Sequence, residues 1–411
     1  MAMLSSLLSP TRVLSFDELS PEDFVKAIDY LGRRPRRVAL VVDKRPFPER
    51  DRLAAAARSR FDTVLLDAVS PDPLCSDIDG MLGGGALEGV ELVVGIGGGS
   101  VLDTAKALAV LARAGGRLED YLGASPSRRL EAKGPPLLLL PTTAGTGSEV
   151  TKVGVYRDGT GRKHSLGSPF LQADAALLVG SLAVSMPPAL AASTGFDALS
   201  HALESLWNRN ATGTTAEAAV EAAIAVMRRL PPAYEAAKAV ESGASTRRDA
   251  TSRAAARGML EASAMAGFAF SITGTAMVHA LSFVLTEEWR VPHGTACAFA
   301  LEDGFRLALG DPEARKSLAR IGDALFLRDG QGVSPGAAPA SADGAELLLG
   351  KILELKAAMG LPSSFADLGV VLPRDRVRSL FARAFDDPKM ANTRPAADPD
   401  AVYAFLEAKA R

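Results

Sequence analysis

Histidine is scarce in this chain, and most of the histidines occur in segments whose residue types and spacing suit metal binding. The sequence has 411 residues and four histidines. Asp197 and His201 are four positions apart in GFDALSHALES, so on a helix they share one face. His279 falls in a second helical stretch, and His293 lies between a proline and a glycine. Because one carboxylate and three imidazoles suit Fe²⁺ or Zn²⁺, these four residues predict a divalent metal site.

The prediction depends on the set of four and not on any one member. A single histidine in an apolar segment more often has a structural role, hydrogen-bonded in the core. The remaining histidine, His164 in GRKHSL, lies outside the set, and we expect it at the surface or at a pocket rim. The two cysteines, Cys75 and Cys297, lack the close spacing of a thiolate metal motif, so we expect buried free thiols.

A glycine-rich stretch predicts a phosphate site. In VVGIGGGSVLDTAKALAVLA, Gly97, Gly98 and Gly99 end an apolar run, and a helical segment follows at once. Glycine lets backbone N–H groups approach a phosphate, and the helix N-terminus carries partial positive charge. Ser100 is placed to cap the helix or bind the phosphate, and Asp103 lies one turn along. A tight turn without a ligand explains the glycines equally well when they are considered alone.

A second segment favours the nucleotide interpretation. PTTAGTGSEVTK, residues 141–152, ends another apolar run in small residues and hydroxyls, as nucleotide sites at the carboxyl ends of parallel strands do. Asp43, at the end of ALVVD, is placed to bind a ribose 2′-hydroxyl, which favours NAD over NADP. Lys44 and Arg45 follow it and weaken that preference. Neither segment is G-x-G-x-x-G, so we predict a variant dinucleotide site.

The pattern of the chain changes near residue 185. Before it, apolar runs alternate with Ala- and Leu-rich segments, which is typical of a parallel sheet covered on both faces; the runs are 37–43, 61–67, 91–99 and 135–141. Further strand candidates lie at 152–158 and 174–180. After residue 185, helical segments continue to the C-terminus. We therefore predict an α/β domain at 1–185, an all-helical domain at 186–411, and a cleft between them.

The composition argues against several other classes of protein. The net charge is −2 and the basic residues are scattered, so we expect neither nucleic acid nor a membrane as a partner. The longest apolar region, GFAFSITGTAMVHALSFVL, contains Ser, Thr and His, and a buried helix pair explains it better than a membrane span. The N-terminus is a poor secretion signal. We expect a cytoplasmic protein with a mobile low-complexity loop at 328–344.

Four motifs together resemble the iron-containing (group III metal-dependent) alcohol dehydrogenase family along nearly the whole chain. They are GGGSVLDTAK, PTTAGTGSEVT, GFDALSHALES and VPHG, the last with His279 fourteen positions before His293. The resemblance implies a Rossmann-like dinucleotide-binding domain followed by an all-helical metal domain, the dehydroquinate synthase-like fold. It also implies a homodimer and one metal ion, Fe²⁺ or alternatively Zn²⁺, held by Asp197, His201, His279 and His293.

The same resemblance implies which residues line the cofactor cleft. For NAD(P)H these are Gly97, Gly98, Gly99, Ser100, Asp103, Thr142, Thr143, Ser148 and Lys163. The chain departs from the family at Phe283. Many members carry a histidine there, four residues after the third ligand and near the nicotinamide, where it is credited with proton relay. Phe283 leaves the metal ligands intact, makes the pocket more apolar and puts the usual proton route in doubt.

Site and resemblance together predict reduction of a small aldehyde to a primary alcohol. A metal with an open position acts as a Lewis acid, and the nicotinamide carries the hydride. The segments HALESLWNRNATGTTAEAA, TAMVHALSF and YRDGTGRKHSLGSPFL are most similar to the phosphonoacetaldehyde reductase branch, which makes 2-hydroxyethylphosphonate in phosphonate natural-product biosynthesis. An anionic aldehyde needs cationic partners near the metal. The available ones are Lys152, Arg157, Lys163, Arg209, Arg290 and Arg394.

Other functions stay open at this level. A general alcohol or lactaldehyde reductase would use the same machinery on uncharged substrates, and a sulfoacetaldehyde reductase would need a similar anion pocket. A lyase of the dehydroquinate synthase type would use bound NAD⁺ only transiently. A purely structural role is the remaining alternative, although no position of the ligand set is broken.

Overall fold

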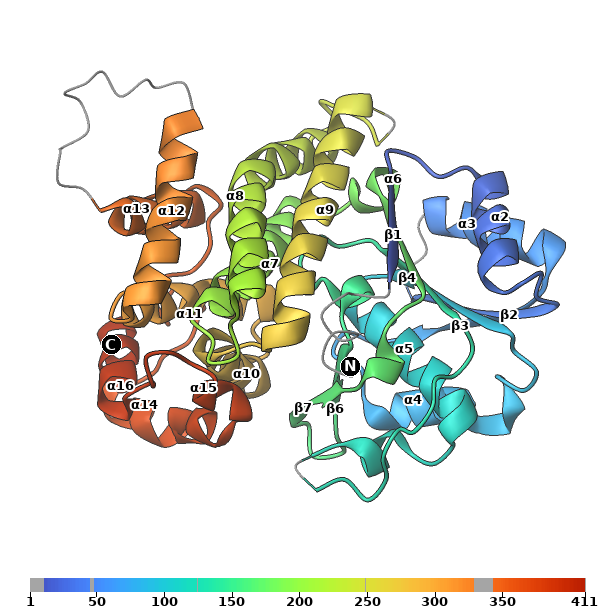
Figure 1. The fold of residues 1–411 in the computed structure, drawn as a ribbon, viewed down its shortest axis with the longest axis horizontal. Helices are drawn as coiled ribbons and strands as arrows, with labels where there is room; N and C mark the ends of the chain where they lie inside the picture. The colour runs from blue at the N-terminus through green and yellow to red at the C-terminus, as the bar shows by residue number, and fades with distance from the viewer. Residues whose placement is uncertain (1–10, 45–47, 124, 248, 329–342, 411) are drawn as a thin grey trace.

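The computed structural model describes residues 11–44, 48–123, 125–247, 249–328 and 343–410. The loop predicted at 328–344 therefore lies outside the described residues except at its ends. Figure 1 shows a sheet with helices on both sides, and beside it an array of helices that runs to the C-terminus.

The main sheet is parallel throughout the part of the chain that the structure describes. Six strands pair in the order β1 (Arg12–Phe16), β8 (Ala175–Val179), β5 (Leu137–Pro141), β4 (Leu92–Gly97), β2 (Arg37–Asp43) and β3 (Asp62–Val69). The four predicted runs and the candidate at 174–180 are all strands of this sheet. The edge strand β1 was not predicted, because it has only five residues and leaves Val13 and Leu14 exposed.

Helices cover both faces of this sheet, which is why its central strands β2, β4, β5 and β8 are almost continuously apolar and buried. Val38 and Leu40 of β2 point to one face, where α2 (Pro21–Leu31) and α3 (Pro48–Arg60) pack. Ala39 and Val41 point to the other face, which is covered by α4 (Cys75–Leu82) and α5 (Gly99–Ala114).

The candidate strand at 152–158 does not join the parallel sheet. It forms β6 (Val153–Arg157), which pairs antiparallel with β7 (Lys163–Gly167) in a separate two-stranded hairpin. Its buried and part-buried residues alternate, as expected for a hairpin with one covered face. Tyr156 anchors the hairpin to α5, because its hydroxyl donates to the carbonyl of Asp103 at 2.9 Å.

Helices follow β8 to the C-terminus, beginning with the short α6 (Gly180–Ala183). One hydrophobic cluster joins most of the later ones. They are α7 (Pro188–Leu206), α8 (Gly213–Glu241), α9 (Ala250–Thr273), α10 (Met277–Trp289), α11 (His293–Ala308), α12 (Pro312–Arg328), α13 (Gly344–Ala358), α14 (Arg374–Phe381), α15 (Pro388–Ala391) and α16 (Pro399–Lys409). The predicted boundary at residue 185 lies between β8 and α7, and the division into two domains there stays a prediction.

The long apolar region forms a helix pair, as predicted. It spans the end of α9 and the beginning of α10, which are bent by 103° at the break between them. Within the described residues no helix by itself has the length and hydropathy needed to cross a membrane, although these two bent helices reach that threshold when counted together.

Candidate active site

A cavity of about 440 Å³ lies between the carboxyl edge of the sheet and the helices. The segments that follow β2, β3, β4 and β5 line one side, and α7, α9, α10 and α11 line the other. The carboxyl edge of an open parallel sheet is where such folds bind ligands, and the volume suits a small-molecule site.

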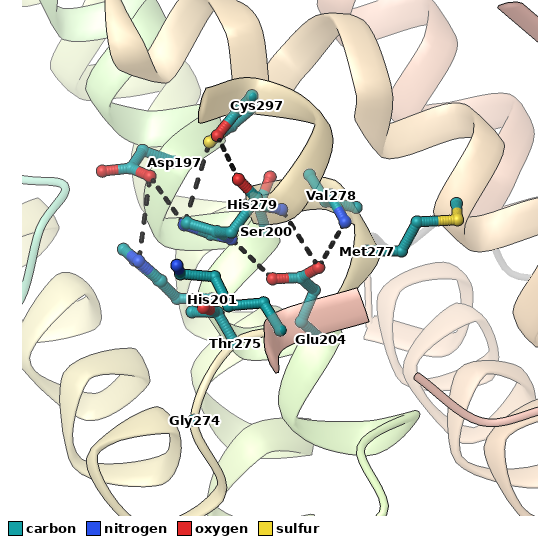
Figure 2. A network of polar contacts seen from close by, with 12 residues as sticks. Asp197, Ser200, His201, Glu204, Gly274, Thr275, Met277, Val278, His279 and Cys297 are labelled. Carbon is teal, nitrogen blue, oxygen red and sulfur yellow. Dashed lines mark hydrogen bonds and ion pairs between the residues drawn. The ribbon is translucent and has the colours of Figure 1, made fainter. Parts of the chain in front are cut away.

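The four predicted metal ligands meet at one end of this cavity. Oδ1 of Asp197 lies 3.8 Å from Nε2 of His201, 3.5 Å from Nε2 of His279 and 3.7 Å from Nε2 of His293. Asp197 and His201 share a face of α7, as their spacing predicted, whereas α10 and α11 contribute the other two (Figure 2 labels all but His293). The packing of these three helices therefore brings distant parts of the sequence to one point.

The burial of the set, and the neutral form of two of its imidazoles, fit a divalent cation. Oδ1 of Asp197 is buried and has no hydrogen-bond partner among the described residues, which is costly unless a cation lies beside it. Burial lowers the pKa of His201 to about 4 and that of His293 to about 3. Both imidazoles are therefore neutral at pH 7, which is the form that binds metals. Burial opposes a raised pKa at His279, but Cys297 and Glu204 beside it raise that pKa, so this ring would release a proton on binding an ion. These residues are able to hold a divalent ion.

Glu204, one helical turn beyond His201 on α7, orients one of the predicted ligands. Its Oε2 lies 2.5 Å from Nδ1 of His279, and its Oε1 accepts the N–H of Val278 at 2.6 Å (Figure 2). Occupying Nδ1 in this way leaves Nε2 free to face Asp197. Our sequence reasoning missed Glu204, although the spacing of Asp197, His201 and Glu204 along one helix face was a usable signal.

Cys297 lies against the same imidazoles. Its Sγ is 3.8 Å from Nε2 of His279 and 3.8 Å from Nε2 of His293. Both Cys297 and Cys75 are buried and unpaired, as predicted. The position of Cys297 beside the predicted metal site was not predicted, although it follows His293 by four residues and so shares a face of α11 with it.

Eight of the ten predicted cofactor residues line the cavity, and two do not. Gly97 and Thr142 lie just outside it, where the N–H of Thr142 donates to the carbonyl of Gly97 at 2.9 Å. A Cβ on Gly97 would lie 2.5 Å from the side chain of Val101, so this glycine lets β4 pack against the first turn of α5. The cavity-lining ones are Asp43, Gly98, Gly99, Ser100, Asp103, Thr143, Ser148 and Lys163.

The glycine turn directs the start of α5 toward the cavity. Gly98 is the N-cap residue and Gly99 begins the 16-residue helix. A Cβ on Gly99 would lie 2.6 Å from the side chain of Thr146, so glycine permits the two segments to touch. The Ser100 hydroxyl accepts the N–H of Asp72 at 3.1 Å and so ties the turn to the segment after β3. This turn has the features of a phosphate site.

Asp103 and Ser148 have structural partners as well as a place in the cavity wall. The Ser148 hydroxyl donates to Asp103 at 2.6 Å, and the N–H of Val155 donates to the same carboxyl at 2.9 Å. Burial raises the pKa of Asp103. This pair holds the β6–β7 hairpin against α5.

His164, on β7, does not line the cavity; its Nε2 lies 2.7 Å from Asp158.

Two lysines flank Phe283 beside the predicted metal end of the cavity. Nζ of Lys389 lies 3.9 Å from the centre of the Phe283 ring, and Nζ of Lys163 lies 5.6 Å from it. Each lysine also has a carboxylate partner: Lys163 is 2.7 Å from Asp72, and Lys389 is 3.1 Å from Asp387. The Phe283 ring lies 5.9 Å from the ring of His293, centre to centre.

Among the six basic residues proposed to bind an anion, the structure places Lys163 alone in the cavity wall. Arg394 pairs with Asp311 at 2.9 Å, and Arg209 and Arg290 are exposed. Lys152 and Arg157 are also absent from the lining. Sequence reasoning missed Lys389, which belongs to a four-residue helix near the C-terminus and has no motif around it.

Comparison with known proteins agrees with this architecture. Residues 16–179 match the model of the iron-containing alcohol dehydrogenases, and residues 191–410 match the C-terminal model of the same family. Long-chain-alcohol dehydrogenase 1 of Geobacillus thermodenitrificans is 41% identical, over 51% of this chain and half of its own length. Sulfoacetaldehyde reductase of Bilophila wadsworthia is 33% identical, over 78% of this chain and 77% of that protein.

A solved structure extends the likeness to three dimensions. The sulfoacetaldehyde reductase from Bifidobacterium kashiwanohense, in complex with NAD⁺, superposes with a TM-score of 0.81 at 26% identity and 98% coverage of both chains. The predicted fold class is thus confirmed. The family uses NAD(H) and a divalent metal, in keeping with a metal-competent site beside a glycine turn. The chain therefore belongs to the iron-containing alcohol dehydrogenase family and is an oxidoreductase.

Proposed function

We propose that this protein is a metal-dependent, NAD(P)H-linked reductase that converts a small anionic aldehyde into a primary alcohol. Phosphonoacetaldehyde is the proposed substrate and 2-hydroxyethylphosphonate the product, in phosphonate natural-product biosynthesis. The observation that carries the proposal is the convergence of Asp197 with three histidines at one end of a cavity whose wall also contains the glycine turn of α5.

Different side chains of the cavity wall would bind the metal ion and the cofactor. When bound, the divalent ion would polarise the aldehyde oxygen, and the nicotinamide would supply the hydride. Asp197 and the three imidazoles would hold the ion, with the ring of His279 oriented by Glu204. The N-terminus of α5 would bind the cofactor's pyrophosphate, and Asp43, which lines the cavity, would bind its ribose.

Lys389 is the group that we assign to the substrate's negative charge. Lys389 lines the cavity, and its Nζ lies over the Phe283 ring. An ammonium group has three N–H donors, and the ion pair with Asp387 does not use all of them. Burial lowers the pKa of Lys389, and Asp387 opposes that shift. An anionic group would form charge-assisted hydrogen bonds to the donors that remain.

The reductase activity is tested by following the loss of NADH or NADPH absorbance after aldehyde is added. We expect the rate to fall to background when a chelator removes the metal, and to return when Fe²⁺ or Zn²⁺ is restored. Undiminished turnover in protein shown to be metal-free would refute the metal-dependent mechanism. Turnover without any net change in nicotinamide absorbance would instead favour the lyase alternative.

The substrate is tested with Lys389→Met and a neutral aldehyde of similar size. Losing the charge-assisted hydrogen bonds should lower kcat/KM for phosphonoacetaldehyde by about 10- to 150-fold, with a small effect on acetaldehyde. Lys316→Met, on α12, is the control and should change neither value. Faster turnover of acetaldehyde than of phosphonoacetaldehyde by the unaltered enzyme would overturn the assignment.

Sulfoacetaldehyde is the second candidate substrate. Two relatives that carry the name sulfoacetaldehyde reductase support it, one by sequence and one by structure. A sulfonate would use the same Lys389 contact, so the variant does not separate the two anions. The ratio of their kcat/KM values in the unaltered enzyme does, and a ratio that favours sulfoacetaldehyde would replace the phosphonate assignment. A general alcohol or lactaldehyde reductase would favour neither anion.

A further inference from the structure

Five metal-binding side chains converge at the site, one more than the predicted set. Single ligand atoms of Asp197, His279, His293 and Cys297 all lie within 4.8 Å of one another. The sulfur belongs to Cys297, which lies one turn after His293 on α11 and is fully buried. His201 is the fifth member and stacks on His279, with ring centres 4.5 Å apart.

Several separations between the ligand atoms already approach those of atoms bonded to one metal ion. Bonds of about 2.0–2.3 Å to nitrogen, oxygen and sulfur place neighbouring ligand atoms roughly 3.3–3.8 Å apart. Asp197 lies 3.5 and 3.7 Å from the nitrogens of His279 and His293, and Sγ of Cys297 lies 3.8 Å from each of those nitrogens. No large movement is needed for these four atoms to share an ion.

A second observation points to an ion at this place. Oδ1 of Asp197 is aimed into the cluster, and the residue is 2% exposed. Its closest imidazole nitrogen is 3.5 Å away, longer than a good N–H···O hydrogen bond. A buried carboxylate oxygen without a hydrogen bond indicates that a cation lies between it and the surrounding nitrogen and sulfur atoms.

Cys297 approaches the cluster from the side away from the cavity. The cavity wall includes Asp197, His201, His279 and His293, whereas Cys297 is not part of it. Figure 2 shows Cys297 and His201 on opposite sides of the His279 ring. A sulfur ligand from the protein interior would therefore leave the cavity-facing position of the ion open to a substrate.

We propose that the Cys297 thiolate is a further ligand of the metal ion, so that the donor set contains one sulfur as well as nitrogen and oxygen. On binding, a sulfur–metal bond forms and the thiol proton passes to solvent. A soft thiolate shifts the preference of the site from Fe²⁺ toward Zn²⁺. The alternative role, a small buried hydrophobic side chain, would place the thiol against carbon atoms and not against two imidazole nitrogens.

The test uses the full-length protein loaded with Co²⁺ alone. Thiolate bonded to Co²⁺ gives a ligand-to-metal charge-transfer band in the near ultraviolet that nitrogen and oxygen ligands do not give. We expect this band in the unaltered protein and its loss in Cys297→Ser, which should still bind one Co²⁺ per chain with lower affinity. Cys75→Ser is the matched control, because Cys75 is the other cysteine of the sequence and lies on α4, and it should keep the band.

A band missing from the unaltered protein, or unchanged in Cys297→Ser, would overturn the proposal. X-ray absorption of the unaltered protein loaded with Zn²⁺ needs no variant and covers the case in which Cys297→Ser does not fold. A sulfur shell at about 2.3 Å is expected, and a shell of nitrogen and oxygen alone would overturn the proposal. Neither readout depends on turnover, so a failure of the reductase assay leaves this result intact.

Discussion

At the scale of single residues, Glu204 controls how His279 presents its ring. The carboxylate is fully buried and accepts hydrogen bonds from Nδ1 of His279 and from the N–H of Val278. Both contacts hold the ring at the start of α10 with Nε2 toward Asp197. A carboxylate behind an imidazole also raises the basicity of the other ring nitrogen, which here faces the predicted metal site.

Glu204→Gln should therefore weaken metal binding while preserving side-chain volume. Loss of such an outer carboxylate costs about 10- to 100-fold in metal affinity. Competition with a chromophoric chelator measures the affinity directly. Glu288→Gln, at a partly exposed glutamate of α10 that pairs with Arg383, is the control and should bind metal as the unaltered protein does. Equal affinity in Glu204→Gln would show that Glu204 does not support the metal site.

At the scale of elements, two glycines allow α9 to touch the segment after β5. Gly147 has a positive φ of 56°, and a Cβ there would lie 2.6 Å from the Cα of Gly267. A Cβ on Gly267 would lie 2.8 Å from the carbonyl oxygen of Gly147. Because Ser148 follows directly and lines the cavity, this backbone contact helps to set the distance between the helices and the sheet edge.

Gly267→Ala should destabilise the protein, since neither backbone can move without displacing its element. The expected loss is about 1–3 kcal/mol in the free energy of unfolding, as for other overpacked positions. Urea unfolding measures it. Gly350→Ala is the matched control, because Gly350 also lies in a helix, α13, and its Cβ would meet no atom within 4 Å. The control should gain roughly 0.5–1 kcal/mol from helix propensity, and similar effects at both sites would contradict the argument.

At the scale of the whole molecule, buried charge makes stability depend on pH. Burial raises the pKa of Glu149 from 4.5 to about 7 and lowers that of Lys106 from 10.5 to about 8. Between pH 4.5 and 7 the folded state binds the Glu149 proton more tightly than the unfolded state does. The stabilisation from neutral Glu149 is therefore complete below pH 4.5 and is lost as pH rises to 7. Lys106 acts in the opposite sense, adding stability as pH rises from about 8 to 10.5.

Glu149→Gln should remove the lower of these two transitions. Relative to the unaltered protein, the variant should gain stability as pH rises from 4.5 to 8, by about 3 kcal/mol for a shift of this size. Unfolding by urea at a series of pH values measures the difference. Glu354→Gln, at an exposed glutamate of α13, should run parallel to the unaltered protein. Parallel curves for Glu149→Gln would show that Glu149 ionises normally in the fold.

Two statements about the whole molecule stay predictions. The homodimer follows from the family resemblance, and the cytoplasmic location follows from the composition. Sedimentation equilibrium is expected to give twice the mass of one chain, and a monomer mass would correct the first. Fractionation of the source cells would check the second.

The sequence by itself determined what depends on local spacing. Apolar runs of strand length predicted five strands of the main sheet, since a strand buried on both faces is apolar at every position. The four-residue spacing of Asp197 and His201 placed both on one face of α7, and three successive glycines marked the turn before α5. Such features are set by backbone geometry within a few residues, so they can be recognised before any tertiary contact is known.

Only the tertiary structure decided which distant side chains share a site. Lys389 reaches the cavity because α15 packs against α10. Glu204 reaches His279 because α7 also packs against α10. The segment at 152–158 left the parallel sheet for a hairpin because Lys163–Gly167 supplied an antiparallel partner. Cys297 lies against two imidazoles because α10 and α11 pack together. Each of these outcomes depends on how separate elements pack against one another, which local periodicity does not encode.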